Sequence, residues 1–133
     1  MKIVVIDGQG GSLGKAITEK IKSRYNCEIY AIGTNSIATA AMLKAGADYG
    51  ATGENPVVVN SRDADVIIGP IGIIAANSLL GEITPKMAAS VAFSEAKKIL
   101  VPVNKCKIKV AGTPELSFGD AIECAVKELG ELL

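Results

Sequence analysis

Four glycines near the start of this 133-residue sequence have the spacing of a phosphate-binding loop. They lie in the segment Gly8-Gln9-Gly10-Gly11-Ser12-Leu13-Gly14, between a hydrophobic run and a helical pattern. Glycine has no Cβ, so the main chain can approach a phosphate closely, and the N–H groups at a helix start attract the anion. We therefore expect this loop to bind a phosphate group. The alternative is a tight turn that only packs the helix against a sheet.

The spacing of these glycines departs from the two best-known phosphate loops. A Gly-x-Gly-x-x-Gly fingerprint would place its last glycine at Leu13 rather than at Gly14, and a P-loop would need Ser or Thr at Ala16. The loop instead resembles the Gly-x-x-x-Gly-x-Gly loop of short-chain dehydrogenases, with Ser12 at the middle glycine. That resemblance stops at the loop, because no Tyr is followed four residues later by the Lys of that family's active site.

Two later loops are expected to face the same crevice as the glycine loop. Gly33-Thr34-Asn35-Ser36 has no acidic residue at the place where dinucleotide folds bind the ribose, about 20 residues past the loop. NADP is therefore not excluded, although capping a helix explains Asn35 and Ser36 equally well. Gly69-Pro70-Ile71-Gly72 is a rigid apolar loop that suits the flat face of an adenine, nicotinamide or flavin ring, or else is a buried strand-to-helix turn.

A carboxylate, an amide and a thiol are further candidates for chemistry. Asp7 directly precedes the glycine loop, and we expect it to support the loop by accepting hydrogen bonds from loop amides; the alternative is a general base. Asn104 suits a hydrogen bond to a ring amide, and Cys106 is either a reactive thiol or a small core residue. The residues expected to bind a cofactor are Gly8, Gln9, Gly10, Gly11, Ser12, Leu13, Gly14, Thr34, Asn35, Ser36, Gly69, Pro70, Ile71, Gly72 and Asn104.

The composition excludes several kinds of chemistry and partner. There is no His, which removes His-ligated zinc and Ser-His-Asp or Cys-His catalysis. The three cysteines include no CxxC pair, so we expect no metal site, and reduced thiols suit the cytoplasm. Fourteen basic side chains balance fourteen acidic ones, which argues against nucleic acid as a partner. No apolar stretch reaches the roughly 20 residues that cross a bilayer, so no membrane partner is expected.

Hydrophobic periodicity divides the chain into alternating strands and helices. Nearly continuous apolar runs predict strands at residues 2–7, 28–32, 47–52, 65–69 and 98–103. One helix is expected after the glycine loop and another after Ser36, its predicted N-cap. A short helix capped by Asn55 is expected next, because a parallel sheet needs a crossover there, although Val57-Val58-Val59 is equally typical of a strand.

The second half of the chain is predicted in the same way. A helix after residue 72 is expected to break near Gly81 and to restart at Thr84-Pro85. Residues 105–110 alternate Lys with Cys, Ile and Val, which predicts a half-exposed edge strand. Ser117 and Asp120 resemble a capping box that opens a final helix. Its inner face is expected to carry Phe118, Ile122, Ala125, Leu129 and Leu132.

Strands that alternate with helices predict a parallel sheet with helices on both faces. We expect one Rossmann-like α/β domain over residues 1–133, with three layers and a mostly parallel sheet of five to six strands. If the strand order is 3-2-1-4-5, both glycine loops face the same crevice. In such folds the ligand lies beyond the carboxyl ends of the strands beside strand one, where residues 8–14 fall. An aliphatic-rich composition, 49% hydrophobic, also suggests a buried subunit interface and hence a homodimer or larger homo-oligomer.

Taken whole, the sequence resembles a small bacterial family described as a domain of unknown function, DUF3842. The resemblance rests on four blocks: Ile6-Asp7-Gly8-Gln9-Gly10-Gly11, Gly33-Thr34-Asn35-Ser36-Ile37-Ala38-Thr39-Ala40-Ala41, Gly69-Pro70-Ile71-Gly72-Ile73 and Pro102-Val103-Asn104-Lys105-Cys106. It implies a Rossmann-like nucleotide-binding fold and gives no activity or catalytic residue. Ser12 departs from a glycine that is more usual in that family.

These observations leave three functions open. The first is a protein that binds a small-molecule nucleotide, NAD or NADP, through residues 8–14 and the loops that face them. The second is a small enzyme or flavoprotein, with FMN as the cofactor, in which Asp7, Asn104 or Cys106 acts on a substrate. The third is an oligomeric scaffold whose glycine loops are purely structural.

Overall fold

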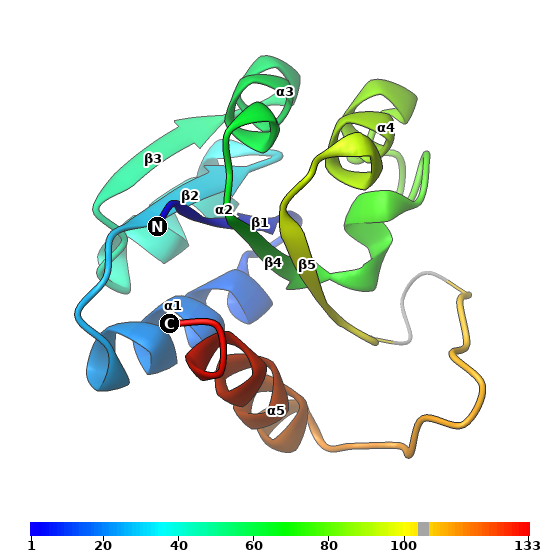
Figure 1. Cartoon of the computed structure of the whole chain (residues 1–133). Helices are drawn as coiled ribbons and strands as arrows, with labels where there is room; N and C mark the ends of the chain where they lie inside the picture. Colours follow the sequence, from blue (N-terminus) through cyan, green and yellow to red (C-terminus); the bar gives the residue numbers. More distant parts are fainter. Residues whose placement is uncertain (104–106) are drawn as a thin grey trace.

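Five parallel strands form one sheet at the centre of the protein (Figure 1). The computed structural model describes residues 1–103 and 107–133. Every neighbouring pair of strands is parallel, and the strand order is β3-β2-β1-β4-β5. This is the order for which both glycine loops were expected to face one crevice. The strands are β1 (Ile3–Asp7), β2 (Ile29–Gly33), β3 (Tyr49–Thr52), β4 (Val66–Pro70) and β5 (Lys97–Val101).

Helices cover both faces of the sheet and make the expected three-layer α/β architecture (Figure 1). α1, α2 and α5 lie on one face, and α3 and α4 lie on the other. The helices are α1 (Ser12–Arg24), α2 (Ser36–Lys44), α3 (Glu54–Arg62), α4 (Pro85–Phe93) and α5 (Phe118–Gly130).

Alternate side chains of β1 enter two separate hydrophobic cores. Ile3 and Val5 pack with α1 and α5, whereas Val4 and Ile6 pack with α3 and α4. All four side chains are fully buried. A strand covered on both faces needs an apolar residue at every position, which explains the continuous run in the sequence.

Two helices begin at residues other than those expected. Asn35, not Ser36, caps α2, because its backbone is extended and its Oδ1 accepts a 2.9 Å hydrogen bond from an N–H in the first turn. α3 is the helix that the crossover required, but it begins at Glu54. Gly53 precedes it with a φ of 108°, so Asn55 lies inside the first turn instead of capping it.

The segment between β4 and α4 is not the helix that the sequence suggested. It holds a short 3-10 turn, Ile71–Ile74, followed by turns in which Asn77, Leu79 and Leu80 have positive φ. The N–H of Asn77 donates to the carbonyl of Ile83 at 2.7 Å, so the chain curls back on itself. This curl buries Leu79 beside the glycine loop.

The last two helices begin where the sequence predicts. Thr84 caps α4 and Ser117 caps α5, because each hydroxyl accepts a 3.1 Å hydrogen bond from an N–H in the first turn. Between β5 and α5, described residues 107–110 form no strand, contrary to expectation. Lys107 has a φ of 53°, which interrupts an extended run; residues 105 and 106 of that segment lie outside the described part of the chain.

α5 buries most of the face that the sequence assigned to it. Ile122, Ala125 and Leu129 are buried against the sheet and α1. Phe118 is different: half of its surface is exposed, so its expected place in the core is wrong. It is the first residue of the helix and reaches past the edge of the core.

α1 can lie close to β1 because residue 14 has no side chain. A Cβ at Gly14 would stand 2.6 Å from Sδ of Met42 and 2.8 Å from Cβ of Asp7, both well inside van der Waals contact. We therefore expect Gly14→Ala to lower the free energy of unfolding by about 1–3 kcal/mol, even though Ala favours helices by about 1 kcal/mol. Urea unfolding followed by circular dichroism measures the change.

Gly10→Ala is the matched control, because a Cβ there would have no atom of residues 1–103 or 107–133 within 4 Å. We expect its free energy of unfolding to stay within about 0.5 kcal/mol of the unmodified protein. Equal stability of the two variants would contradict the close packing at Gly14.

Candidate functional site

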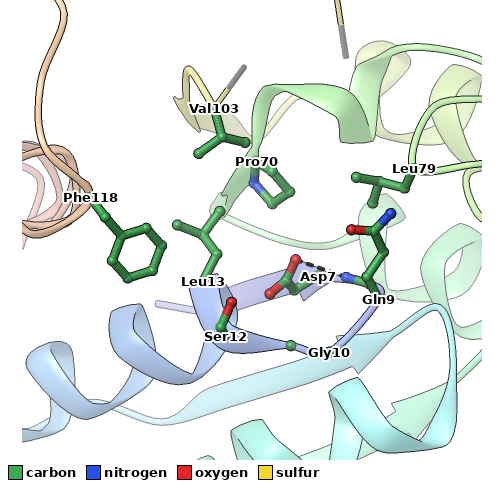
Figure 2. A pocket seen from close by; sticks show the side chains of 11 residues that line it. Asp7, Gln9, Gly10, Ser12, Leu13, Pro70, Leu79, Val103 and Phe118 are labelled. Carbon is green, nitrogen blue, oxygen red and sulfur yellow. Dashed lines mark hydrogen bonds between the residues drawn. The ribbon is translucent and has the colours of Figure 1, made fainter. Parts of the chain in front are cut away.

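A cavity of about 210 Å³ opens at the carboxyl ends of β1 and β4 (Figure 2). This is the topological switch point, where the chain leaves β1 to one side of the sheet and β4 to the other, and where ligands of open α/β sheets bind. The cavity is lined by Asp7, Gly8, Gln9, Gly10, Gly11, Ser12, Leu13, Pro70, Leu79, Val103 and Phe118.

A buried carboxylate fixes the shape of the glycine loop. Asp7 is 5% exposed, and its Oδ1 accepts a 2.8 Å hydrogen bond from the N–H of Gly8. Its Oδ2 accepts a 2.7 Å hydrogen bond from the N–H of Gly14, in the first turn of α1. One side chain therefore ties the start of the loop to its end, which is the supporting role expected from the sequence.

Three of the four glycines in the loop have structural reasons to be glycine. Gly11 has a φ of 76°, and a Cβ there would lie 2.7 Å from Cα of Ala38 in α2. A Cβ at Gly8 would lie 2.5 Å from Oγ1 of Thr34, and Gly14 is enclosed as described above. These glycines are explained by packing and backbone conformation alone.

Gly10 is the exception among these four glycines. It is exposed at the cavity, its φ is not positive, and a Cβ there would have no atom of the described chain within 4 Å. Neither packing nor conformation within the described chain calls for glycine at this position. Glycine at this position leaves the backbone of the loop open toward the cavity.

The same stretch offers backbone donors to an anion. Within the part of the chain that the structure describes, the N–H groups of Gly10, Ser12 and Leu13 have no hydrogen-bond partner. Ser12 and Leu13 open α1, so its dipole adds to their attraction for negative charge. The described lining includes no Lys or Arg, so the donors for a phosphate there are these amides together with the side chains of Gln9 and Ser12.

Glu82, which the sequence analysis did not single out, joins three loops beside the cavity. Its Oε1 accepts hydrogen bonds from the N–H of Gln9 (2.9 Å), Oγ1 of Thr34 (2.6 Å) and Nδ2 of Asn35 (2.7 Å). Nδ2 of Asn35 also donates to the carbonyl of Gln9 at 2.9 Å. The loops after β1 and β2 and the turn before α4 are thereby held together.

These contacts favour the charged form of Glu82. Partial burial by itself raises the pKa of its carboxyl, but the hydrogen bonds from Thr34, the N–H of Gln9 and Asn35 outweigh burial and lower the pKa below its ordinary value. A negative charge therefore stands beside the glycine loop without entering the cavity lining.

The structure brings together only some of the residues expected to bind a cofactor. Residues 8–13 and Pro70 line the cavity, whereas Gly14, Thr34 and Asn35 support the loop from behind or from the side. Ser36 is exposed on α2, away from the lining. Gly69, Ile71 and Gly72 are buried and do not line the cavity, and Asn104 and Cys106 lie outside the described residues.

Three apolar residues of the lining were not among the site residues predicted from the sequence. Leu79 comes from the curled turn, Val103 follows β5, and Phe118 begins α5 (Figure 2). No sequence pattern links these positions to the glycine loop, because the sheet order and the path of each loop bring them there. Phe118 alone carries a local signal, since a large aromatic residue follows the Ser117 cap.

Several other features of the described residues bear on chemistry. They contain no group of three His, Cys, Asp or Glu side chains that could hold a metal ion. Cys27 and Cys124 are free thiols. None of the described helices combines the length and apolar character needed to cross a bilayer.

Comparison with known proteins gives one family and similar solved structures. The family model described as "Domain of unknown function (DUF3842)" matches residues 2–133. A crystal structure of a dodecameric FMN-dependent UbiX-like decarboxylase from Escherichia coli O157:H7 is similar, with a TM-score of 0.50 and 20% sequence identity over 98% of this chain and 77% of that one. No curated protein matches. At this identity the structural similarity shows the fold alone.

The contacts of Glu82 make the stability of the protein depend on pH. Because the pKa of its carboxyl is lower in the folded state, the stabilisation is complete above the unfolded pKa of about 4.3 and is lost as pH falls through the folded value. We expect Glu82→Gln to lower the melting temperature at about pH 7, and we expect this difference to shrink as pH falls below about 4.3. Thermal unfolding across this pH range measures the difference.

Glu128→Gln, which changes an exposed carboxylate on α5, is the control. It should leave the melting temperature nearly unchanged at both ends of the range. A Glu82→Gln difference that is the same at every pH would show that the charge of Glu82 contributes nothing.

Proposed function

The chain belongs to the family described as Domain of unknown function (DUF3842), and we propose that it binds flavin mononucleotide, with the phosphate held by the glycine loop. The observation that carries this proposal is Gly10. It is a glycine with no packing or conformational requirement in the described chain. It stands beside the N–H groups of Ser12 and Leu13, which have no hydrogen-bond partner among the described residues. A phosphate that sits against the backbone there accounts for both features.

The choice of flavin has independent support. The similar solved structure is described as FMN-dependent, and its fold extends over nearly all of this chain. The sequence favoured NAD or NADP, but neither the family model nor the similar solved structure supports those nucleotides. The similar structure fits the flavoprotein alternative better. The apolar part of the cavity lining, with Leu13, Pro70 and Leu79, suits a flat ring system.

The test of this proposal is FMN binding by the unmodified protein and by Gly10→Asp. A carboxylate at residue 10 would occupy the open space at the loop and repel a phosphate, so we expect at least about tenfold weaker FMN binding. Isothermal titration measures the dissociation constants. Riboflavin, which has the ring without the phosphate, should bind the two proteins more nearly equally.

Asn26→Asp is the matched control, because it adds the same charge in the loop that follows α1, at the far end of that helix. It should bind FMN as the unmodified protein does. If Gly10→Asp binds FMN as tightly as the unmodified protein does, the glycine loop is not the phosphate site. Binding of NAD or NADP in place of FMN would return the function to a dinucleotide-binding protein.

We also propose that the protein is a homo-oligomer. Leu80 is 97% exposed and Ile37 is 68% exposed, and an assembly would cover apolar side chains of this kind. The similar decarboxylase is described as dodecameric. We expect light scattering during gel filtration to give a mass of at least twice the 13.7 kDa of one chain. A monomer at every concentration tested would contradict this proposal.

A further inference from the structure

Phe118 stands at the cavity wall without being part of the hydrophobic core. It is the first residue of α5, half of its surface is exposed, and Figure 2 shows its side chain reaching from the helix start toward Leu13. One turn later on the same helix, Ile122 is 3% exposed, and Leu129 is fully buried. Core packing therefore explains the inner face of α5 and does not explain an aromatic residue at its start.

The position of Phe118 is well defined although its ring is not enclosed. The hydroxyl of Ser117 caps α5 by accepting a 3.1 Å hydrogen bond from the N–H of Asp120. Glu123, one turn on, pairs with Lys20 and Arg24 of α1, which fixes α5 against α1. The aromatic ring is thus presented beside the cavity by an anchored helix.

The cavity has two chemically different parts. The glycine loop supplies the backbone N–H groups that suit an anion. The other walls are apolar, with Pro70, Leu79 and Val103 arranged around the opening across from Phe118 (Figure 2). Phe118 is the one aromatic side chain in the described lining. This division matches a ligand with a phosphate at one end and a flat aromatic ring at the other.

We propose that Phe118 binds the aromatic ring of the ligand by stacking and thereby selects phosphate esters that carry such a ring. This inference rests on the proposed function, since it assigns the ring of the same bound nucleotide. In this arrangement the glycine loop binds the phosphate, and Phe118 makes the protein bind FMN more tightly than phosphates that have no ring. Phe118 is a specificity-determining residue.

The first experiment removes the ring and keeps an apolar side chain. Phe118→Leu should weaken FMN binding by about threefold to tenfold, the range that aromatic pairing contributes. The dissociation constant of ribose 5-phosphate, obtained from its displacement of FMN, should be the same for the two proteins, because ribose 5-phosphate has the phosphate without the ring. Equal FMN affinity of the two proteins would overturn the proposal. So would an equal loss for FMN and ribose 5-phosphate, which would indicate a disturbed helix start.

The second experiment adds a signal that a merely structural role would not produce. An indole in contact with a photoexcited flavin donates an electron to it and quenches its fluorescence. Phe118→Trp should therefore retain FMN and strongly quench the fluorescence of the bound flavin. Phe93→Trp is the matched control, because Phe93 is 91% exposed at the end of α4 and does not line the cavity. The chain has no other Trp, so a quench is assigned to the introduced residue.

The outcomes separate this inference from the proposed function. If FMN binds and Phe118→Trp quenches no more than Phe93→Trp does, the glycine loop retains its assignment and the stacking role of Phe118 is refuted. If the unmodified protein and both Trp variants fail to bind FMN, the proposed function and the role of Phe118 fail together.

Discussion

The buried carboxylate of Asp7 is the contact on which the rest of the site depends. A carboxylate out of water is costly unless strong donors surround it, and here the N–H groups of Gly8 and Gly14 supply two of them. Gly11 precedes α1 and has no side chain to cap it, so Asp7 provides a carboxylate acceptor for the first turn of the helix. The buried carboxylate of Asp7 therefore depends on the tight loop and on the close approach of α1 to β1, and both of these depend on the carboxylate.

A second carboxylate extends this arrangement sideways. Glu82 gathers donors from Gln9, Thr34 and Asn35, so the loops after β1 and β2 are fixed relative to each other. Both carboxylates accept hydrogen bonds from loop N–H groups, and within the described chain the amides of Ser12 and Leu13 have no hydrogen-bond partner. The loop is thus held in shape before any ligand arrives, which reduces the ordering cost of binding.

The cavity itself depends on parts of the chain that have little regular structure. Leu79 reaches it only because the segment after β4 curls through residues with positive φ. Phe118 reaches it because α5 returns to the face that α1 occupies, beside the first glycine loop (Figure 1). The phosphate end of the proposed site is therefore local in sequence, whereas the ring end is assembled from distant segments.

The sequence by itself determined the alternation of strands and helices and the glycine loop, because each depends on local patterns: continuous apolar runs, helical periodicity and glycine spacing. It also placed Asp7 in its supporting role. Only the tertiary structure decided that Asn35 caps α2, that Glu82 joins the loops, and that the segment after residue 72 forms no long helix. Asn35 and Ser36 are both residue types that cap helices, so the backbone conformation at residue 35 decides between them. The contacts of Glu82 join residues that lie far apart in the chain, such as Gln9, and no local pattern encodes such pairs.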